Sequence, residues 1–138
     1  MGTQEEFIQV LQNTKLIALA SSFDDAPNVR ILDFYFNPQT KTLVFPTSSK
    51  SSKVNEFEQN NKVAFTTIPA GPGPVIRVKN ATVQKSSVSI DDIKDTLIQK
   101  REGFDKLLMG LGDSVVMYEV SFNEAVMSSK GEIIHISL

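Results

Sequence analysis

The sequence predicts a mainly β protein, a small closed barrel of six or seven antiparallel strands with two or three peripheral helices. Short β-rich segments follow one another through brief turn signals, and brief connections join antiparallel neighbours rather than parallel ones. An open meander of this kind would expose sheet edges to other chains, and closure into a barrel removes those edges. The length of 138 residues suits one domain that spans residues 1–138.

Composition narrows the classes of function. Apolar residues form 41% of the chain and charged residues 22%, which is typical of a soluble globular protein. The longest apolar runs are far shorter than a membrane span, and the acidic start lacks the pattern of a secretory signal, so we expect a cytoplasmic protein. The chain has no cysteine and one histidine, so no disulfide or zinc site is expected. The net charge of −2 argues against general capture of nucleic acid.

The first half of the chain is expected to form a short helix and three strands. Thr3 and Glu6 match a T-x-x-E capping box, and apolar residues then recur at helical spacing, which predicts a helix over about 4–12. Three β-rich segments follow, each ended by turn residues. They are "KLIALASS" (15–22), "NVRILDFYF" (28–36) and "TLVFPT" (42–47).

The middle of the chain is expected to hold a short helix and two further strands. The helix covers about 52–60 and precedes a fourth strand, "KVAFTTI". The loop "PAGPGP" then breaks the chain. In the fifth strand, "VIRVKNATVQK", apolar and charged residues alternate strictly, so one face of this strand is expected to meet water.

The last third of the chain is expected to hold helices and then strands. Ser89 is a suitable cap for a helix in "SIDDIKDTLIQKREG", and "FDKLLMGLGD" is interpreted as its broken continuation. Two strands, "SVVMYEVSF" and "EIIHISL", complete the chain. His135 is expected to lie in the last of them rather than to act as a catalytic or ligand histidine.

The junction "FPTSSKSSKVNEF" carries an unusual concentration of polar chemistry. Five hydroxyl side chains and two lysines fall within nine residues at the start of a predicted helix. A helix N-terminus carries partial positive charge, so Lys50 and Lys53 have the wrong sign there, while Ser51 or Ser52 can cap the helix. A bound phosphate would account for the whole set, because it accepts hydrogen bonds from helix N–H groups, hydroxyls and ammonium. The alternative is a solvated Ser/Lys loop with one ordinary cap.

Arg30 favours the phosphate interpretation. Strand alternation places it on the same face as the apolar residues of its strand, where a guanidinium needs an anionic partner or an exit to solvent. The alternatives are an arginine that reaches water or one paired with Asp24 or Asp25. If the strands around "NPQTK" form a hairpin, Arg30 lies beside the loop at Thr47.

These residues resemble a known family. The segment "NVRILDFYFNPQTKTLVFPTSSKSSKVNEFEQNNKVAFTTI" looks like the core of the pyridoxamine 5'-phosphate oxidase-like flavin proteins, which form a split β-barrel and bind FMN at a homodimer interface. The family pattern has an arginine that opens one strand, an aromatic-x-Thr end to the next, and a Ser-Arg-Lys triplet at the following helix. Here the pattern falls on Arg30, Thr47 and the triplet 51–53, and the resemblance covers about residues 15–85.

The resemblance implies a set of cofactor contacts. It implies that the FMN phosphate is held by Arg30, Thr47, Ser52 and Lys53, with Pro46, Lys50 and Ser51 in the same loop. It implies that the backbone of Ile31, Leu32 and Asp33 lies along the flavin ring, and that Pro74 and Val75 border the cofactor of the other subunit.

The departures from the family pattern shape the functional prediction. Ser52 stands where the vitamin-processing enzymes have arginine, so Lys50 becomes a candidate replacement cation. The ending "EIIHISL" lacks the arginine-bearing segment that grips the vitamer, so a true pyridoxamine phosphate oxidase is not expected. We expect a flavin-dependent oxidoreductase that acts on a small molecule, with NAD(P)H as a candidate reductant. The alternatives are a non-catalytic flavin- or phosphate-ligand-binding protein and a barrel whose loop binds nothing.

Overall fold

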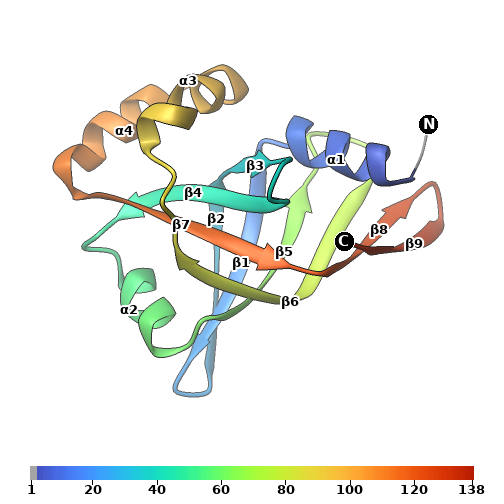
Figure 1. Cartoon of the computed structure of the whole chain (residues 1–138), viewed down its shortest axis with the longest axis horizontal. Helices are drawn as coiled ribbons and strands as arrows, with labels where there is room; N and C mark the ends of the chain where they lie inside the picture. The colour runs from blue at the N-terminus through green and yellow to red at the C-terminus, as the bar shows by residue number, and fades with distance from the viewer. Residues whose placement is uncertain (1–2) are drawn as a thin grey trace.

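The computed structural model describes residues 3–138, which form a curled antiparallel sheet of nine strands with helices around it (Figure 1). The mainly β fold class predicted from the sequence is therefore confirmed. The elements are α1 (Thr3–Asn13), β1 (Leu16–Phe23), β2 (Ala26–Asp33), β3 (Tyr35–Asn37), β4 (Thr42–Ser48), α2 (Ser52–Gln59), β5 (Lys62–Ile68), β6 (Val75–Lys85), α3 (Ile90–Lys100), α4 (Phe104–Leu111), a 3₁₀ turn (Gly112–Ser114), β7 (Val115–Phe122), β8 (Glu124–Ser129) and β9 (Glu132–Ser137).

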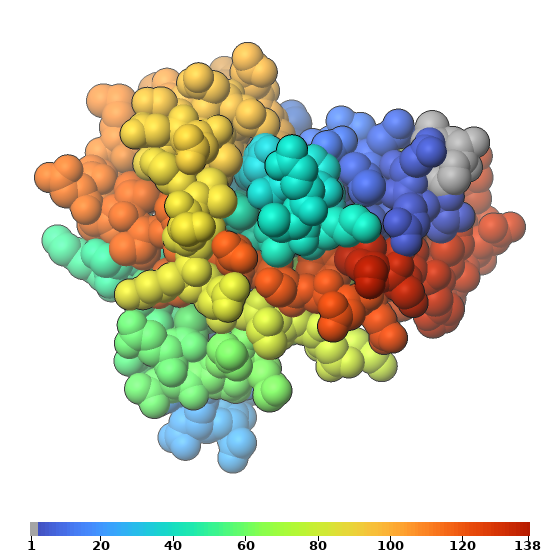
Figure 2. Space-filling view, viewed as in Figure 1, coloured from blue at the N-terminus to red at the C-terminus, as the bar shows by residue number. Residues whose placement is uncertain are grey.

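A tight hairpin begins the sheet. β1 and β2 pair from Leu16 opposite Asp33 to Phe23 opposite Ala26. The two turn residues, Asp24 and Asp25, have φ angles of 53° and 62°, a left-handed conformation that Asp tolerates better than most residues. Figure 2 shows the tip of this hairpin projecting beyond α2. Asp24 and Asp25 therefore form the turn and are not available as a pair of facing carboxylates.

The order of the strands leaves a split in the sheet. The hydrogen-bonded path runs β2-β1-β5-β6-β7-β4-β3, so β2 ends the path on one side. The sheet curls until β2 and β4 lie close together, but no strand pairing joins them within residues 3–138. The barrel is therefore split, as the family resemblance implies, rather than closed, as the strand pattern alone predicts. The chain crosses this gap at Phe34, which follows β2 on one edge and precedes β3 on the other. The split therefore places the end of β2 beside β4.

Two strand predictions need correction. The predicted strand over 28–36 is two strands, because β2 pairs with β1 whereas β3 pairs with β4, and only this short β3–β4 hairpin passes through "NPQTK". The described residues form nine strands rather than six or seven, since β8 was also missed. β8 pairs with β6, where Ser128 lies opposite Val75. It also pairs with β9, where Glu124 lies opposite Ser137.

The main core fills the inside of the curl. Phe7 of α1 packs edge-on against Phe36 and Phe122, with ring centroids 6.4 and 6.3 Å apart, so α1 covers one end of the sheet (Figure 1). Phe57 of α2 packs near the other end, with ring centroids 6.2 Å from Phe45 and 5.3 Å from Tyr118. The two helices are thus held by buried aromatic side chains.

A smaller cluster holds α3 and α4 on the outside of the curl. Val44 of β4 faces away from the main core and packs with Ile93, Leu97 and Phe104. The helix pair is broken at Gly103, whose φ of 91° is a conformation that glycine adopts at no steric cost. The predicted broken continuation is confirmed. No helix within residues 3–138 combines the length and the apolar character needed to cross a membrane.

Candidate functional site

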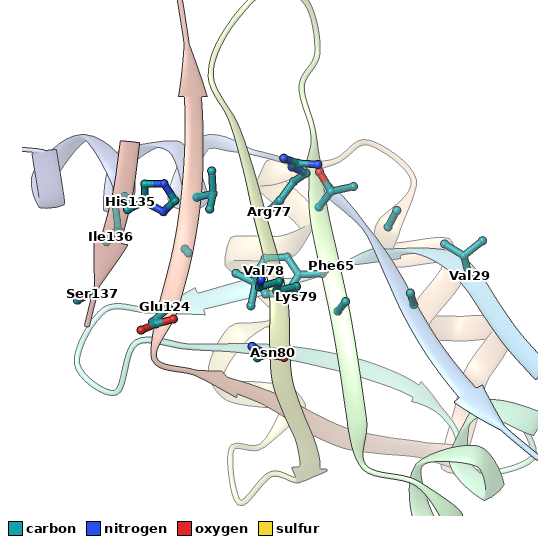
Figure 3. A pocket seen from close by; sticks show the side chains of 16 residues that line it. Val29, Phe65, Arg77, Val78, Lys79, Asn80, Glu124, His135, Ile136 and Ser137 are labelled. Atoms are coloured by element: carbon teal, nitrogen blue, oxygen red, sulfur yellow. The ribbon is translucent and has the colours of Figure 1, made fainter. Parts of the chain in front are cut away.

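A hollow of about 580 Å³ lies on the outer face of the sheet, with strands β1, β5, β6, β8 and β9 beneath it (Figure 3). Three alanines that face away from the main core form part of its floor: Ala18, Ala20 and Ala64. Polar side chains around them are exposed, namely Arg77, Lys79, Glu124 and His135. The predicted exposed face of β6 is therefore confirmed, and His135 lies in the last strand.

A second cavity, of about 350 Å³, lies at the split in the sheet. Seven of the residues predicted for the cofactor site line it: Ile31, Leu32, Asp33, Pro46, Thr47, Ser51 and Lys53. They come from the end of β2, the end of β4 and the start of α2. Ser48 and three residues of α4, Phe104, Leu107 and Leu111, complete the lining. The cavity thus combines polar groups on one side with an apolar wall on the other.

The start of α2 supplies the polar side. Ser51 is the N-cap of the helix, and its hydroxyl accepts a hydrogen bond from the backbone N–H of Lys53 at 3.3 Å. The ammonium of Lys53 turns back toward β4 and donates to the hydroxyl of Thr47 at 2.6 Å. Thr47 is buried. One of the two predicted caps is therefore confirmed, and it stands beside a lysine and a hydroxyl that face the cavity.

Lys53 is a cation in an unfavourable place. Burial lowers the pKa of its ammonium, and the positive charge of Arg30 lowers it further, while the carboxylate of Glu56 acts in the opposite direction. The N-terminal end of α2 adds partial positive charge. Lys53 is the cationic residue that lines this cavity among residues 3–138. An anion bound here would therefore relieve an electrostatic cost already present in the protein.

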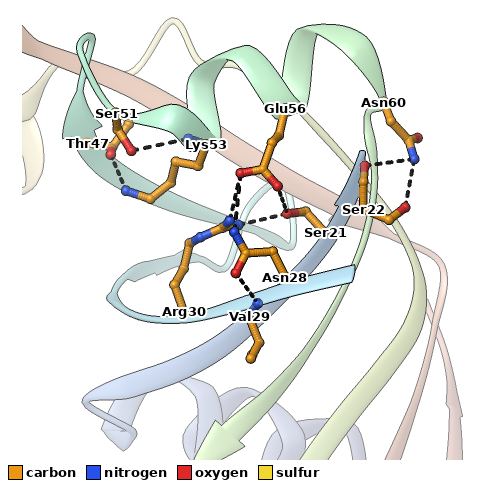
Figure 4. A network of polar contacts seen from close by, with 10 residues as sticks. All are labelled: Ser21, Ser22, Asn28, Val29, Arg30, Thr47, Ser51, Lys53, Glu56 and Asn60. Carbon is orange, nitrogen blue, oxygen red and sulfur yellow. Dashed lines mark hydrogen bonds and ion pairs between the residues drawn. The ribbon is translucent and has the colours of Figure 1, made fainter. Parts of the chain in front are cut away.

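Arg30 belongs to a separate polar network beside the cavity (Figure 4). One guanidinium nitrogen lies 3.0 Å from a carboxylate oxygen of Glu56, and another donates to the hydroxyl of Ser21 at 2.9 Å. Ser21 and Asn28 also donate to the Glu56 carboxylate, at 3.3 and 3.5 Å. The side chains of Arg30 and Glu56 are only 15% and 11% exposed. Each charge in this pair is therefore largely withdrawn from water.

The partner of Arg30 differs from the sequence-based expectations. Arg30 does lie on the face of β2 that carries buried Leu32, as strand alternation predicted. Its anionic partner is Glu56 of α2 rather than Asp24, Asp25 or solvent. Arg30 is close enough to Lys53 to lower its pKa, but it does not line the cavity. The two cations predicted to share one ligand thus have different immediate surroundings.

The remaining predicted residues lie outside the cavity lining. Lys50 is exposed, and its backbone N–H donates to the hydroxyl of Ser48 at 3.1 Å. Ser52 is exposed as the first residue of α2. Pro74 and Val75 are half-buried at the start of β6, where Val75 pairs with Ser128 of β8. Their predicted contact with the cofactor of a partner subunit stays a prediction.

The apolar wall is fixed by a second ion pair. Arg101, at the end of α3, makes a two-pronged contact with Asp33 of β2, one prong of which joins Nη2 to Oδ2 at 2.9 Å. This hydrogen bonding raises the pKa of Arg101. The neighbouring Lys100 donates to the backbone carbonyl of Phe34 at 3.1 Å and lies 3.9 Å from the centre of its ring. Both contacts hold the α3–α4 segment against the end of β2.

Sequence reasoning missed several of these residues. Phe104, Leu107 and Leu111 recur at helical spacing in "FDKLLMGLGD", which is a signal for an apolar helix face but not for what the face covers. Glu56 shares a helix turn with Lys53, and nothing local marks it as a buried carboxylate. Its partner Arg30 is 26 positions away in the sequence, so only the folded sheet brings them together.

Comparisons with solved structures show the fold. A candidate pyridoxamine 5'-phosphate oxidase from Listeria innocua has 16% sequence identity and a TM-score of 0.71, over 95% of this chain and all of that one. A NimC/NimA family protein from Clostridium acetobutylicum has 19% identity and a TM-score of 0.65, over 97% and 91% of the two chains. A heme binding protein from Mycobacterium smegmatis has 7% identity and a TM-score of 0.75, over 99% and 58%. No curated protein sequence matches the chain.

The family assignment rests on sequence. Residues 10–131 match the pyridoxamine 5'-phosphate oxidase-like family, and this segment runs from α1 through the loop between β8 and β9. It contains both the split in the sheet and every residue that lines the 350 Å³ cavity. The chain belongs to the pyridoxamine 5'-phosphate oxidase-like family.

Proposed function

We propose that this protein binds FMN in the cavity at the split and acts as a flavin-dependent oxidoreductase on a small molecule, with NAD(P)H as reductant. The observation that carries the proposal is the lining of that cavity. Thr47, Ser51 and Lys53 stand together on one side of it, with the β2 segment 31–33 beside them. The family pattern assigns Thr47 and Lys53 to the phosphate and the backbone of 31–33 to the ring of FMN, with Ser51 in the same loop. The other two residues assigned to the phosphate, Arg30 and Ser52, lie outside the lining.

The chemistry of the lining fits FMN. Lys53, Thr47 and Ser51 offer an ammonium and two hydroxyls at a helix N-terminus, the kind of donor set that binds phosphate. Ile31 is 63% exposed and Leu107 of α4 is 46% exposed, so apolar surface is available for the isoalloxazine ring. Bound FMN supplies hydride or electron transfer, and the protein supplies orientation and electrostatics.

Energetics favour a homodimer. Three charge-assisted hydrogen bonds at about 1.5–3 kcal/mol each offset only part of an association cost of about 4–15 kcal/mol, so the ring must also be buried. The cavity of about 350 Å³ is near the lower end of the range for ligand sites, about 300–1,000 Å³. A second copy of the chain would enclose the rest of the ring.

The edge of the sheet is suited to such a partner. β2 ends the path of hydrogen-bonded strands, and two of its apolar side chains, Val29 and Ile31, are 64% and 63% exposed. Large apolar side chains on an edge strand are typical of an interface. Val29→Asp should convert a dimer to monomers in sedimentation velocity, whereas Ile98→Asp on α3 should not. Monomeric wild-type protein at all concentrations would contradict the proposed dimer.

A direct test of the cofactor is titration of the purified protein with FMN and riboflavin, followed by fluorescence quenching. Lys53→Gln should weaken FMN binding by about 1.5–3 kcal/mol, roughly 10- to 100-fold, because one charge-assisted contact is lost. Riboflavin, which lacks the phosphate, should be affected little. Lys50→Gln is the matched control and should leave both affinities near those of the wild type. No quenching by either flavin would contradict the proposal.

A second candidate function is flavin binding without catalysis. The observation that favours it is the engagement of Arg30 by Glu56, which leaves Lys53 as the cation at the cavity. Reduction of the FMN complex by NAD(P)H, followed by reoxidation with turnover, distinguishes an oxidoreductase from a binding protein. A hemin titration belongs in the same experiment, since the Mycobacterium smegmatis relative binds heme. A Soret shift without flavin quenching would indicate that the protein binds heme rather than FMN.

A further inference from the structure

Glu56 is an unusual neighbour for a proposed phosphate site. It lies one helical turn after Lys53 on α2, and its side chain is only 11% exposed. Its carboxylate accepts hydrogen bonds from Arg30, Ser21 and Asn28, all of which belong to β1 or β2. A carboxylate is therefore fixed against one of the two cations that the family pattern assigns to phosphate, and its charge also acts on the other, Lys53.

The charge balance of this cluster is low for a phosphate site. Arg30 and Glu56 neutralise each other, and Lys53 contributes one further positive charge, so the three residues sum to about +1. A phosphate monoester carries about −1.5 to −2 at neutral pH. Such a ligand must compete with Glu56 for Arg30, or bind Lys53 while Glu56 repels it.

We infer that Glu56 is a specificity-determining residue, an internal counter-anion that lowers the affinity of the site for phosphate monoesters and narrows the preference for FMN over riboflavin. The inference rests on the proposed function for the identity of the ligand. It differs from a purely structural role, in which Glu56 only compensates the burial of Arg30. In that case its removal would change stability without changing the ratio of the two flavin affinities.

Glu56→Gln removes the charge while keeping the shape of the side chain and one acceptor for Arg30. We expect FMN to bind about 10-fold more tightly to this variant, with riboflavin within about twofold of wild type, because only the phosphate meets the removed charge. Glu58→Gln is the matched control. Glu58 is exposed on the same helix, so this variant makes the same change in net charge without touching the network. An unchanged FMN-to-riboflavin ratio in Glu56→Gln, or an equal shift in Glu58→Gln, overturns the inference.

The double variant Arg30→Gln/Glu56→Gln also tests the inference, because it removes both charges of the buried pair at once. If Glu56 cancels Arg30, the ratio of FMN to riboflavin affinity should stay within about threefold of wild type. A fall of tenfold or more would show that Arg30 holds the phosphate despite Glu56, and this result also overturns the inference.

Titration with inorganic phosphate tests the role of Glu56 independently of whether the protein binds a flavin. In thermal unfolding at constant ionic strength, phosphate should raise the midpoint of Glu56→Gln more than that of wild type, because a ligand of the native state stabilises it. This shift without any flavin binding would contradict the proposed cofactor while supporting the role of Glu56. Flavin binding with no phosphate-dependent difference between the two proteins would contradict the role of Glu56 and leave the cofactor intact.

Discussion

Two arginine–carboxylate pairs fasten the edge strand β2 to helices on either side of the cavity, and they differ in their surroundings. Arg30–Glu56 joins β2 to α2, and Arg101–Asp33 joins the end of α3 to β2. The first pair is 15% and 11% exposed and shares hydrogen bonds with Ser21. In the second pair, Asp33 is 11% exposed like Glu56, but Arg101 is 33% exposed, and it contacts Asp33 through two prongs.

The difference in exposure predicts that the two sides of the cavity tolerate substitution to different extents. Loss of Arg30 leaves a carboxylate uncompensated in a pair whose two partners are both withdrawn from water, whereas Arg101 is partly exposed and water can take over part of its role. The polar side at α2 is therefore held by an arrangement that tolerates little change. The apolar wall at α4 is held by an arrangement that can be loosened at small cost. The proposed phosphate site should keep its shape while the proposed ring site adapts.

The largest expected effect is that of Arg30→Ala. The variant leaves the buried carboxylate of Glu56 without its cation, so the free energy of unfolding should fall by about 3–5 kcal/mol. Urea denaturation followed by circular dichroism measures it. Adding the second change in Arg30→Ala/Glu56→Gln should restore part of the loss, since the stranded charge is gone. If the free energy of unfolding of Arg30→Ala fell by less than about 1 kcal/mol, the Arg30–Glu56 pair would contribute no more to stability than a surface ion pair.

The fold could be predicted as far as local patterns determine it. β-rich composition identified β1 and β5, strict alternation identified β6, and the turn residues that follow β1 indicated the first hairpin. The division of 28–36 at Phe34 could not be predicted, because the backbone stays extended on both sides and only the pairing partner changes. β8 was missed because "EAVMSS" is short and only weakly alternating.

The candidate site, like the fold, could be predicted only where its residues lie close together in the sequence. The Thr47, Ser51 and Lys53 group lies within one short segment, so its composition already marked it. The contacts of Glu56 and Asp33 join residues 26 and 68 positions apart, and no local pattern reports which charges will meet when the sheet curls. Sequence therefore indicated the phosphate side of the cavity and gave no sign of its internal counter-anion.

The second expected effect, that of Ser21→Ala, tests whether Arg30–Glu56 behaves as a network rather than as a pair. Ser21 is buried and its hydroxyl contacts both charged partners. Loss of hydrogen bonds to charged groups should lower the free energy of unfolding by about 1.5–3 kcal/mol. Ser22→Ala on the same strand, which leaves the ion pair untouched, is the control in the same urea titration. Equal losses of unfolding free energy in the two variants would mean that Ser21 does not strengthen the Arg30–Glu56 pair.

The third effect is a pH dependence located at the Arg101–Asp33 pair. Burial lowers the pKa of the adjacent Lys100 to about 8, and the negative charge of Asp33 offsets part of this shift. Because the folded pKa lies below the ordinary value of about 10.4, the unfolded chain binds more protons between these two pH values, so stability rises with pH there. We expect a gain of about 1 kcal/mol from pH 7.5 to 9.5, reduced by partial solvent exposure. The same slope in Lys100→Gln would assign the gain to another group.

The smallest expected effect is that of Arg101→Ala. Arg101 is partly exposed and the positive charge of Lys100 still acts on Asp33, so loss of Arg101 should lower the free energy of unfolding by less than about 1 kcal/mol. Asp33 then faces the cavity without this partner, and the α4 wall loses a tether. FMN and riboflavin should therefore weaken to the same extent, because the wall contacts the proposed ring site and not the phosphate. Flavin titration of Arg101→Ala beside Lys53→Gln measures this contrast. If Arg101→Ala weakened FMN alone, the proposed ring would lie on the other side of the cavity, and the contrast between the two pairs would have to be reversed.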